Sequence, residues 1–311
     1  MDIPITQSEK WQKLQDDLGE ISHFEKQDDY QYLAIEKHTK AGNYLFVPYG
    51  PVATTEKGFK TALESLKSLA KTINAIFIRI EPRTPSQAEY LPIRAKKVKD
   101  IEPAETWVLD LPKISTDDPL TDPAVKALLP SRLLRYYKNR EKQGITIETS
   151  HNPDDIKHLL KLQKALATKK GITTFTENYL KNELKQPFAT LYLLKQDKKI
   201  LAAGLVFDDD ATKIRYNLQG AQSEEGRPLH ATGILTIQLI KDAITKNYDI
   251  FDFWGIAPEG ADHTHPWYGF TAFKKTFSGR EQKYAGTYDL ILNSTKYKLF
   301  NLFKKLNKLI R

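Results

Sequence analysis

The region 154–254 constrains the fold of this chain most strongly, because its expected helices and strands follow a distinctive order. Two helices come first, a hairpin and a third strand follow, and a long apolar helix leads into a buried final strand. This order predicts an α+β domain in which one helix separates the last two strands. The elements are expected at Asp154–Lys169, Thr176–Lys185, Ala189–Leu194, Lys199–Phe207, Lys213–Leu218, Pro228–Lys246 and Tyr248–Trp254.

The first half of the chain has a comparable order, opened by a helix with Ser8 as its N-cap. Both halves are similar to acyltransferase domains of the GNAT type. The predicted fold class is therefore α+β with two GNAT-like domains, which a chain of 311 residues can accommodate. We place the boundary just after Gly144, which should end a basic helix. The other elements expected in this half are Tyr30–Glu36, Tyr44–Val47, Gly58–Thr72, Ala75–Ile80 and Trp107–Leu111.

Composition excludes several kinds of protein and site. The chain has no cysteine, which rules out disulfides, thiolate nucleophiles and cysteine-bound zinc. No apolar run is long enough to span a bilayer, and the N-terminus lacks the pattern of a signal peptide, so we expect a soluble cytoplasmic protein. The net charge of +8 favours anionic partners such as tRNA, a nucleotide diphosphate or an acidic membrane surface.

A basic helix in the middle of the chain is a candidate contact for RNA. The segment Leu128–Gln143 places Arg132, Arg135, Lys138 and Arg140 around two tyrosines, which suits contacts to the backbone of tRNA. A solvated helix face is the alternative.

A second basic helix is expected at the C-terminus, over Ser294–Arg311. It is amphipathic, with an apolar stripe of Leu299, Phe303, Leu306 and Ile310 and many lysines elsewhere. Such a helix could rest on the inner face of the plasma membrane as a peripheral contact. Alternatively, it packs back on a domain and leaves its basic face in solvent.

The stretch Tyr248–Leu292 has the character of an active-site rim. It runs from a buried strand through a polar loop into an aromatic segment that carries Lys274 beside Phe273. Apolar surroundings would desolvate the Lys274 ammonium and leave it able to stabilise a developing negative charge. The alternative is a strand lysine whose stem packs against aromatic rings. If the segment is extended, Lys275 points to solvent.

The polar loop carries Asp262, His263 and His265, which could bind a metal or move a proton. Two histidines without a third ligand are more typical of a surface loop, so we expect no metal site. Asp110 and Asp252 are the acidic side chains nearest the predicted site, and each fits a structural position at a strand end equally well. The chain has no P-loop, dinucleotide-binding fingerprint or nucleophile elbow.

Seven segments spread over nearly the whole chain occur in the order of one known family. They are ITQSEKWQKLQ, VPYGPV, WVLDL, LLPSRLLRYYKNREKQGITIE, YDIFDFWGI, YGFTAFKKTFSG and YAGTYDLIL. Together they resemble the Fem family of peptidoglycan interpeptide-bridge aminoacyltransferases. The resemblance implies two GNAT-like domains, 1–147 plus 287–311 and 148–286, with the C-terminal helix packing back on the first.

The resemblance also implies an activity. An amino acid would pass from aminoacyl-tRNA, acting as co-substrate, to the side-chain amine of the third stem-peptide residue of a peptidoglycan precursor. The precursor would be UDP-linked or lipid-linked. We expect a monomer that needs no cofactor.

Roles for single residues follow from the same resemblance. Lys274 and Phe273 match a Phe-Lys pair associated with the aminoacyl end of tRNA and with catalysis. Lys13 matches a lysine that contacts the nucleotide diphosphate of the precursor, and Tyr179 matches a tyrosine of the same site. The remaining residues expected to bind substrate are Trp11, Tyr216 and Trp254.

The chain departs from the family pattern in three places. Phe175 stands where the better-studied soluble members have a phosphate-binding arginine, and Leu218 stands where they have a tyrosine. Both changes make the lipid-linked precursor a competitor for the role of acceptor. The long helical hairpin of the staphylococcal members is also missing.

Two other functions stay open on the sequence. One is an acyl-CoA-dependent N-acyltransferase of the GNAT type, for which Gln219-Gly220-Ala221 resembles a fragment of the pyrophosphate loop. The other is a non-catalytic basic protein that binds RNA or a membrane surface.

Overall fold

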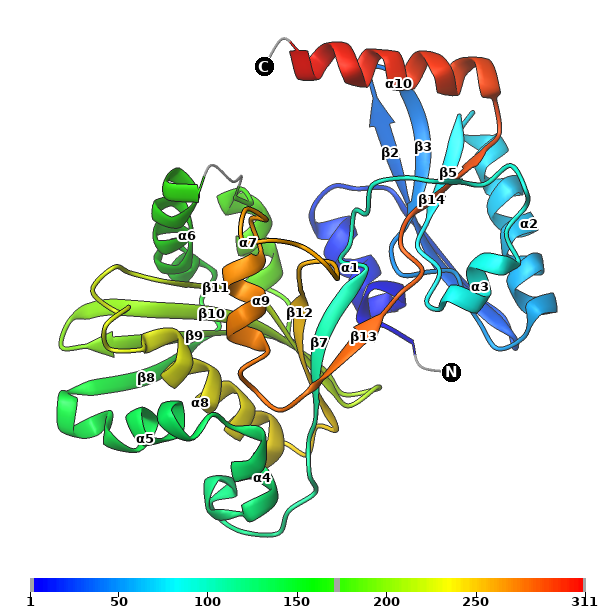
Figure 1. The fold of residues 1–311 in the computed structure, drawn as a ribbon. Helices are drawn as coiled ribbons and strands as arrows, with labels where there is room; N and C mark the ends of the chain where they lie inside the picture. The colour runs from blue at the N-terminus through cyan, green and yellow to red at the C-terminus, as the bar shows by residue number, and fades with distance from the viewer. Residues whose placement is uncertain (1–2, 171–173, 310–311) are drawn as a thin grey trace. The chain divides into compact units, whose positions relative to one another are not determined.

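The chain folds into two compact units, which are described separately (Figure 1). The computed structural model describes residues 3–170 and 174–309. Unit 1 comprises Met1–Ala104 and Lys283–Arg311, and unit 2 comprises Glu105–Gln282. Each unit has its own mixed β-sheet and its own apolar core, so the predicted α+β class is confirmed.

The sheet of unit 1 has the strand order β1-β2-β3-β5-β14-β6, with β4 paired to β2. The pair β3–β5 is parallel and is connected through α2, while the other pairs are antiparallel. The strands are β1 (Ser22–Lys26), β2 (Tyr30–Thr39), β3 (Gly42–Val47), β4 (Val52–Ala53), β5 (Phe77–Ile80), β6 (Lys96–Lys97) and β14 (Tyr288–Ile291). The helices are α1 (Glu9–Asp17), α2 (Glu56–Thr72), α3 (Pro85–Glu89) and α10 (Ser294–Leu309).

Helix α2 lies along one face of this sheet (Figure 1). Its N-cap is Thr55, whose side chain accepts a hydrogen bond from the backbone N–H of Gly58. Its apolar residues recur at helical spacing, and Phe59, Leu63 and Leu66 are all buried. They join the strand residues of the unit 1 core, which explains why the segment is helical.

Strand β14 brings the C-terminal part of the chain back into the unit 1 sheet. Arg79 on β5 and Asp289 on β14 form a buried bidentate ion pair, with Nε–Oδ1 and Nη2–Oδ2 distances of 2.7 and 2.8 Å. The hydroxyl of Tyr297 donates to the same Asp289 carboxylate at 2.8 Å. A buried carboxylate needs such partners, so these contacts hold β14 in place against β5 and α10.

Helix α10 packs back on unit 1, as expected. Phe300 and Tyr297 pack edge-on against Phe77, with ring centroids 5.1 and 5.3 Å apart. The helix docks through these two aromatic residues and not through the stripe expected from the sequence, because Leu299 and Phe303 are exposed. Two residues of that predicted stripe, Leu306 and Ile310, fall where side chains are not described.

The sheet of unit 2 has the order β13-β7-β12-β11-β10-β9-β8. The pair β11–β12 is parallel, and the neighbouring pairs β7–β12, β10–β11, β9–β10 and β8–β9 are antiparallel. The strands are β7 (Glu105–Asp110), β8 (Ile145–Ser150), β9 (Ala189–Gln196), β10 (Lys199–Asp209), β11 (Ile214–Gln222), β12 (Ile250–Gly255) and β13 (Arg280–Lys283). The helices are α4 (Pro123–Leu128), α5 (Ser131–Asn139), α6 (Ile156–Lys170), α7 (Glu177–Leu184), α8 (Ala231–Thr245) and α9 (Tyr268–Lys274).

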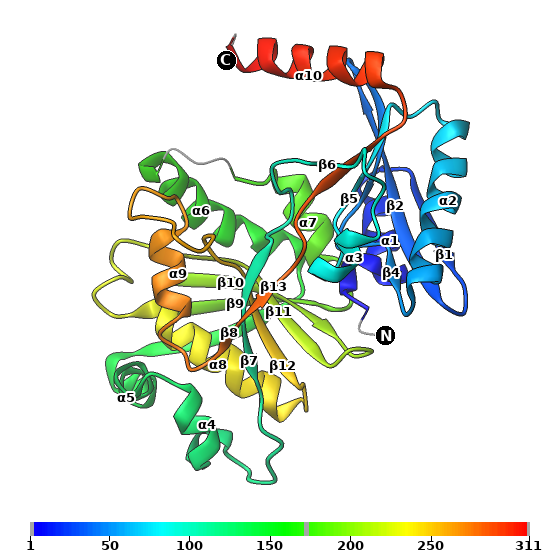
Figure 2. The same cartoon turned by 45° about the vertical axis from the view of Figure 1, so that its right-hand side comes forward.

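Helices cover both faces of this sheet (Figure 2). α6 and α7 lie on one face, and α8 lies on the other with α5 packed beside it. α8 is apolar on nearly every side and contributes Ile234, Ile237 and Ile240 to the core. Gly233 lets α5 approach closely, since a Cβ there would lie 2.6 Å from the Leu133 side chain.

The division between the units differs from the boundary placed near residue 147. The segment 105–147 belongs to unit 2, because β7 pairs with β12 and β8 pairs with β9. Leu134 and Tyr137 of α5 are also buried in the unit 2 core. The second crossing between units lies at Gln282–Lys283. The sequence places the first boundary too late because a strand reveals its pairing partner only in the folded sheet.

One local alternative is decided, and one local prediction is wrong. The aromatic segment is the helix α9, so the strand reading weighed for Lys274 and Lys275 does not apply, although Lys275 is exposed as that reading implied. The single basic helix over Leu128–Gln143 is divided between α4 and α5, because Pro130 interrupts it. Gly144 does end this region in the left-handed conformation, at φ 68°.

The other elements expected from the sequence are confirmed to within four residues at their described ends. The Ser8 side chain caps α1, and α6 and α7 belong to the acyltransferase core because Leu159, Leu160 and Leu180 are buried. Within the described residues, no helix is long and apolar enough to cross a membrane.

We expect Phe300→Ala to lower the free energy of unfolding by about 3 kcal/mol or more, because it removes a buried ring and leaves a cavity beside Phe77. The matched control Leu302→Ala removes a side chain that is 53% exposed and should change it by less than about 0.5 kcal/mol. Urea unfolding measures both. Equal effects of the two changes would contradict this docking face.

Candidate active site

The candidate site lies where the parallel pairing of β11 and β12 stops. Register partners run from Ile214–Ile250 to Tyr216–Asp252 and end there. Beyond this point β11 pairs only with β10, and β12 pairs only with β7. Backbone groups at such an end can turn toward other partners, so it is a natural place for a site.

A bulge on β12 shapes this point. Asp252 is opposite Val108 and Gly255 is opposite Thr106, so two residues of β12, Phe253 and Trp254, face a single residue of β7. Trp254 has a φ of 65°, which is unfavourable for a bulky side chain. The Asp252 carboxylate accepts the Trp254 N–H at 2.7 Å and so supports this conformation.

Lys274 reaches the bulge from α9. Its Nζ donates to the Gly255 carbonyl at 2.5 Å, and the side chain is half-buried. Burial lowers the pKa of Lys274 to about 8, and the negative charge of Asp252 opposes this shift. A lysine with this pKa still carries its proton at neutral pH, but it can lose it more easily than an ordinary lysine.

The rest of α9 is held by contacts of Thr271 and Phe273. Thr271 accepts the Ala257 N–H at 2.7 Å and donates to the Trp267 carbonyl at 2.9 Å. Phe273 packs against the unit 2 core, with its ring centroid 5.5 Å from that of Phe277. The adjacent residues Phe273 and Lys274 therefore have different roles. Phe273 anchors the helix on the core, and Lys274 reaches the bulge.

Tyr216 and Trp254, both predicted to bind substrate, lie together at this point. Their rings meet edge to face with centroids 5.9 Å apart, Tyr216 being buried and Trp254 half-buried. Leu218, at the position where the resemblance leads us to expect a tyrosine, is the extra residue of a bulge on β11, because Asn217 is opposite Val206 and Gln219 is opposite Leu205.

The predicted acceptor residues are distributed over both units. Lys13 is exposed on α1 of unit 1 and forms an ion pair with Asp17 at 3.1 Å. Trp11, on the same helix, is buried. Tyr179 on α7 of unit 2 stacks on the exposed Phe175 with ring centroids 4.8 Å apart. Their roles in binding the precursor stay predictions.

The four basic residues predicted to bind tRNA have different surroundings. Arg132 and Arg135 lie over the ring of Tyr136, at 5.7 and 5.9 Å from its centroid. By contrast, Arg140 covers Tyr137 and forms an ion pair with Glu141. The remaining one, Lys138, is exposed.

His230, at the start of α8, was not predicted from the sequence. It lies in one cluster with Arg132, Arg135 and Tyr136. Its ring lies against Tyr136 with a centroid distance of 4.3 Å, and its Nε2 is 3.4 Å from Arg132 Nη2. Burial and the nearby Arg132 lower the pKa of His230. Only the packing of α5 beside α8 reveals this contact, since Arg132 and His230 are 98 positions apart in the sequence.

The other polar candidates have structural partners. Asp110 forms a bidentate ion pair with Arg280 that joins β7 to β13. His263 is exposed, and His265 Nδ1 accepts the Trp267 N–H at 3.1 Å. The described part of the chain contains no cluster of His, Asp and Glu suited to a metal ion. Thr271 was also missed by the sequence analysis, because its contacts depend on the helical form of α9.

Comparisons with known proteins bear on these residues. The sequence profile of the FemAB family matches residues 135–305. A UDP-N-acetylmuramoylpentapeptide-lysine N(6)-alanyltransferase of Weissella viridescens is 23% identical over 202 residues, which cover 63% of this chain and 56% of that protein. The match thus spans less than two thirds of the relative's own length.

Solved structures support the fold. FemX superposes with a TM-score of 0.76 at 19% identity, covering 95% of this chain and 94% of that one. A tandem GNAT protein from the clavulanic acid biosynthesis pathway superposes with a TM-score of 0.52 at 13% identity, covering 85% and 79%. The two GNAT-like domains expected from the sequence are therefore confirmed. Since its profile match covers more than half of the sequence and includes β11, β12 and Lys274 on α9, the chain belongs to the FemAB family.

Proposed function

We propose that this protein is an aminoacyltransferase of peptidoglycan synthesis. It transfers an amino acid from aminoacyl-tRNA to the side-chain amine of the third stem-peptide residue of a precursor and so builds an interpeptide bridge. The observation that carries the proposal is the half-buried Lys274, held at the β12 bulge with a pKa of about 8 in a chain of the FemAB family.

Membership of the family and the name of the Weissella viridescens relative support this chemistry. That name specifies alanyl transfer to the N6 amine of a lysine in a UDP-linked muramoyl pentapeptide. An identity of 23% does not assign to this chain the amino acid that the relative transfers or the form of its precursor. Both UDP-linked and lipid-linked acceptors are therefore included in the proposal.

The reaction joins an amine to an ester carbonyl. The acceptor amine attacks the carbonyl carbon of the ester that links the amino acid to the terminal ribose of tRNA. The carbonyl oxygen gains negative charge, and collapse of the intermediate breaks the ester bond and releases the ribose hydroxyl. The amine loses one proton and the ribose oxygen gains one, so the step is balanced without an oxidant, metal or cofactor.

Lys274 acts on the charge that develops in this step. Its ammonium is fixed by the Gly255 carbonyl in partly apolar surroundings, where a charged donor stabilises an oxyanion more than it does in water. It stabilises the transition state more than the ester, because the ester carries no net charge at that oxygen. Phe273 positions Lys274 through its packing on the core.

The cluster of Arg132, Arg135, Tyr136 and His230 supplies a surface for tRNA on unit 2. Two exposed guanidinium groups suit phosphates, and an aromatic side chain between them suits stacking with an unpaired base. Lys138, three residues after Arg135, extends the basic face of α5, and Arg140 follows the end of the helix. A reaction that draws on charged tRNA takes place in the cytoplasm.

One experiment tests the whole proposal. The purified protein is incubated with a pool of charged tRNAs and with UDP-linked and lipid-linked precursors in separate reactions, and the products are identified by mass. A precursor heavier by one aminoacyl residue supports the proposal and names both substrates. Acetyl-CoA binding with no such product points to an acyl-CoA enzyme, and tRNA binding without transfer points to a non-catalytic protein.

We expect Lys274→Met to lower the rate of transfer by about a hundredfold or more, because one charged donor to an oxyanion contributes roughly 3 kcal/mol. Lys275→Met is the matched control, since Lys275 is exposed, forms an ion pair with Glu281 and lies over the Trp107 ring. Its turnover should change by about twofold or less. Single-turnover transfer from charged tRNA measures both, and normal turnover of Lys274→Met would sink the assignment.

The pH profile separates the charged role of Lys274 from a role as a base. The acceptor amine reacts in its uncharged form and has an ordinary pKa of about 10.4. Its deprotonation alone therefore raises the logarithm of the rate by about one for each pH unit. If Lys274 must be charged, this rise should level off above pH 8. A lysine needed in its neutral form would instead give a slope of about two below pH 8 and about one above.

Lys274→Arg is the control for this profile. Arginine keeps its charge throughout the range, so the break near pH 8 should disappear whatever the absolute rate. Persistence of the break in this variant would assign it to another group.

We expect Lys13→Ala to raise the KM for the precursor by about tenfold with little change in kcat, because a charge-assisted contact to phosphate contributes roughly 1.5 kcal/mol. Lys60→Ala is the matched control, since Lys60 also pairs with an acid four residues away on an exposed helix of unit 1. An unchanged KM for Lys13→Ala would argue against a phosphate contact there.

A further inference from the structure

Helix α10 has two apolar faces, and only one of them is used for folding. Tyr297 and Phe300 are buried against Phe77 in unit 1. Leu299 and Phe303 occupy another side of the helix and are 51% and 46% exposed. The fold gains nothing from keeping these large apolar side chains in water, so an explanation outside the unit 1 core is needed.

Leu302 widens the exposed face, since it is 53% exposed and lies three residues after Leu299 and one before Phe303. Residues spaced by three and four positions share one side of a helix. We call Leu299, Leu302 and Phe303 the apolar stripe of α10. It is continuous over at least one turn of the described helix.

Lysines border the apolar stripe. Lys298 and Lys305, four and three residues from Leu302, lie beside the stripe, and Lys304 lies on the side of Phe300. All three are exposed, and the sequence of the helix from Ser294 to Leu309 contains no Asp or Glu. An apolar stripe with a basic border is the pattern of a helix that lies in the plane of a membrane interface. A partner with negative charge and apolar depth is therefore indicated.

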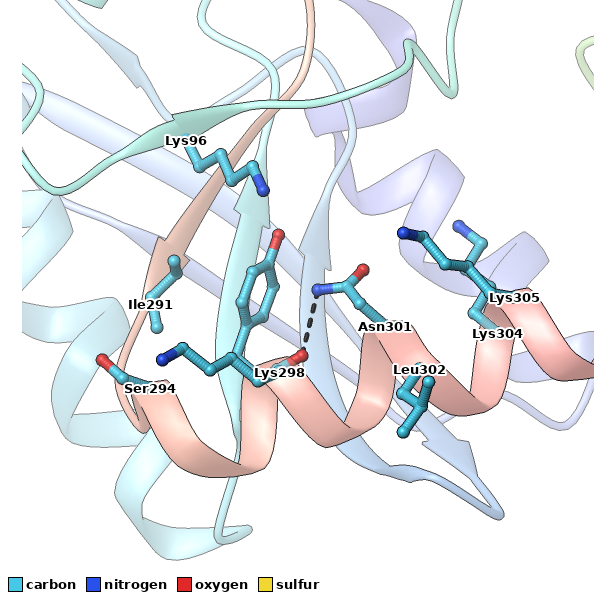
Figure 3. A pocket seen from close by; sticks show the side chains of 9 residues that line it. Lys96, Ile291, Ser294, Lys298, Asn301, Leu302, Lys304 and Lys305 are labelled. Carbon is cyan, nitrogen blue, oxygen red and sulfur yellow. Dashed lines mark hydrogen bonds between the residues drawn. The ribbon is translucent and has the colours of Figure 1, made fainter.

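A groove runs beside the helix and combines the same two properties. Its volume is about 650 Å³, and its apolar lining includes Ile291, Tyr297 and Leu302. Lys96 reaches toward α10 from β6 with its Nζ 6.0 Å from the Tyr297 ring, while Lys298 and Lys305 lie on the helix (Figure 3). Such a groove can receive an acyl chain or its glycerol end with an anionic headgroup at the lysines.

We propose that α10 and this groove form a membrane-surface site that binds bilayers containing anionic phospholipid. The apolar stripe enters the headgroup boundary, and the lysines contact the acidic headgroups. RNA fits the site less well, because a phosphate backbone offers no apolar layer for Leu299, Leu302 and Phe303. The proposal goes beyond the transferase function and does not rest on it.

The first experiment measures co-sedimentation of the full chain with vesicles. Vesicles of phosphatidylcholine mixed with phosphatidylglycerol should bind the protein, and vesicles of phosphatidylcholine alone should bind it far less. Replacing Lys298, Lys304 and Lys305 by Gln should lower the partition coefficient about a hundredfold, since each basic residue near an anionic surface contributes about fivefold. Added salt should weaken binding of the parent protein more than that of this variant.

A charge-matched control separates a defined site from general attraction. Replacing Lys57, Lys60 and Lys71 on α2 by Gln removes the same charge from exposed positions of the same unit. Binding of this control should change by about twofold or less. Equal losses in both triple variants would mean diffuse attraction by net charge and would overturn the proposal.

An apolar pair of variants tests insertion. Replacing Leu299 and Phe303 by Gln should lower binding at least about tenfold, because two large side chains no longer leave water. Replacing Ile21 and Ile93 by Gln removes two apolar side chains of unit 1 that are at least as exposed, at 54% and 105%, and should have little effect. Unchanged binding of the Leu299 and Phe303 variant would overturn the apolar part of the site.

Two readouts complete the test. Urea unfolding should be the same for all these variants, because every substituted side chain is exposed. Binding of uncharged tRNA, measured in parallel, should be unaffected by the α10 substitutions. Failure of the parent protein to bind anionic vesicles, or loss of tRNA binding in the α10 variants instead, would overturn the proposal whatever the outcome of the transfer assay.

Discussion

The short parallel pairing of β11 and β12 is the constraint on which the candidate site depends. It extends only from Ile214 and Ile250 to Tyr216 and Asp252, while each strand continues with a different antiparallel partner. The fully buried Arg215 holds β11 against β10 through a bidentate bond to Asp208, at 2.6 and 2.7 Å, and also donates to the Leu239 carbonyl of α8. Because these partners satisfy the buried charge, they hold β11 in its register on β10. The parallel ladder ends one residue pair beyond Arg215, and the bulge at Trp254 follows directly on β12.

Two opposing effects set the charge of Lys274. Burial disfavours the ammonium, and the nearby Asp252 favours it. Burial is the larger effect, so the pKa falls to about 8. At pH 7 about ten molecules are charged for each neutral one at this pKa. Without a nearby carboxylate, a buried lysine can titrate well below neutrality and would then be a poor donor to an oxyanion. Asp252 therefore matters to the site without touching a substrate, and its hydrogen bond to Trp254 also maintains the bulge that presents the Gly255 carbonyl.

Much of this arrangement could be predicted from the sequence, and the failures share a cause. Periodicity identifies α2, α8 and the strands around them, because the sequence spacing of apolar residues shows whether one face or every face of an element is buried. The sequence left open whether the aromatic segment around Lys274 is extended, and the packing of Phe273 and Phe277 on the same core at helical spacing settles it as helix α9. His230 and Thr271 could not be predicted, because each gains its meaning from a residue brought close by the fold. The resemblance identified Phe273 and Lys274 without predicting the bulge that Lys274 contacts.

Helix α10 illustrates how a correct pattern can lead to a wrong docking face. Its strongest apolar stripe includes Leu299 and Phe303, and hydrophobic periodicity alone would bury that stripe. The sheet of unit 1 instead selects Tyr297 and Phe300, because Phe77 and Tyr44 offer aromatic rings to pack against and the buried Asp289 accepts the Tyr297 hydroxyl. The helix is therefore held by one face while the more aliphatic face stays exposed with its lysines. An apolar stripe that drives docking becomes buried in the unit's own core. A stripe that stays exposed after its helix has docked is available to another partner. On the proposed function, a membrane contact through this face would bring the transferase to the surface where lipid-linked precursors are found.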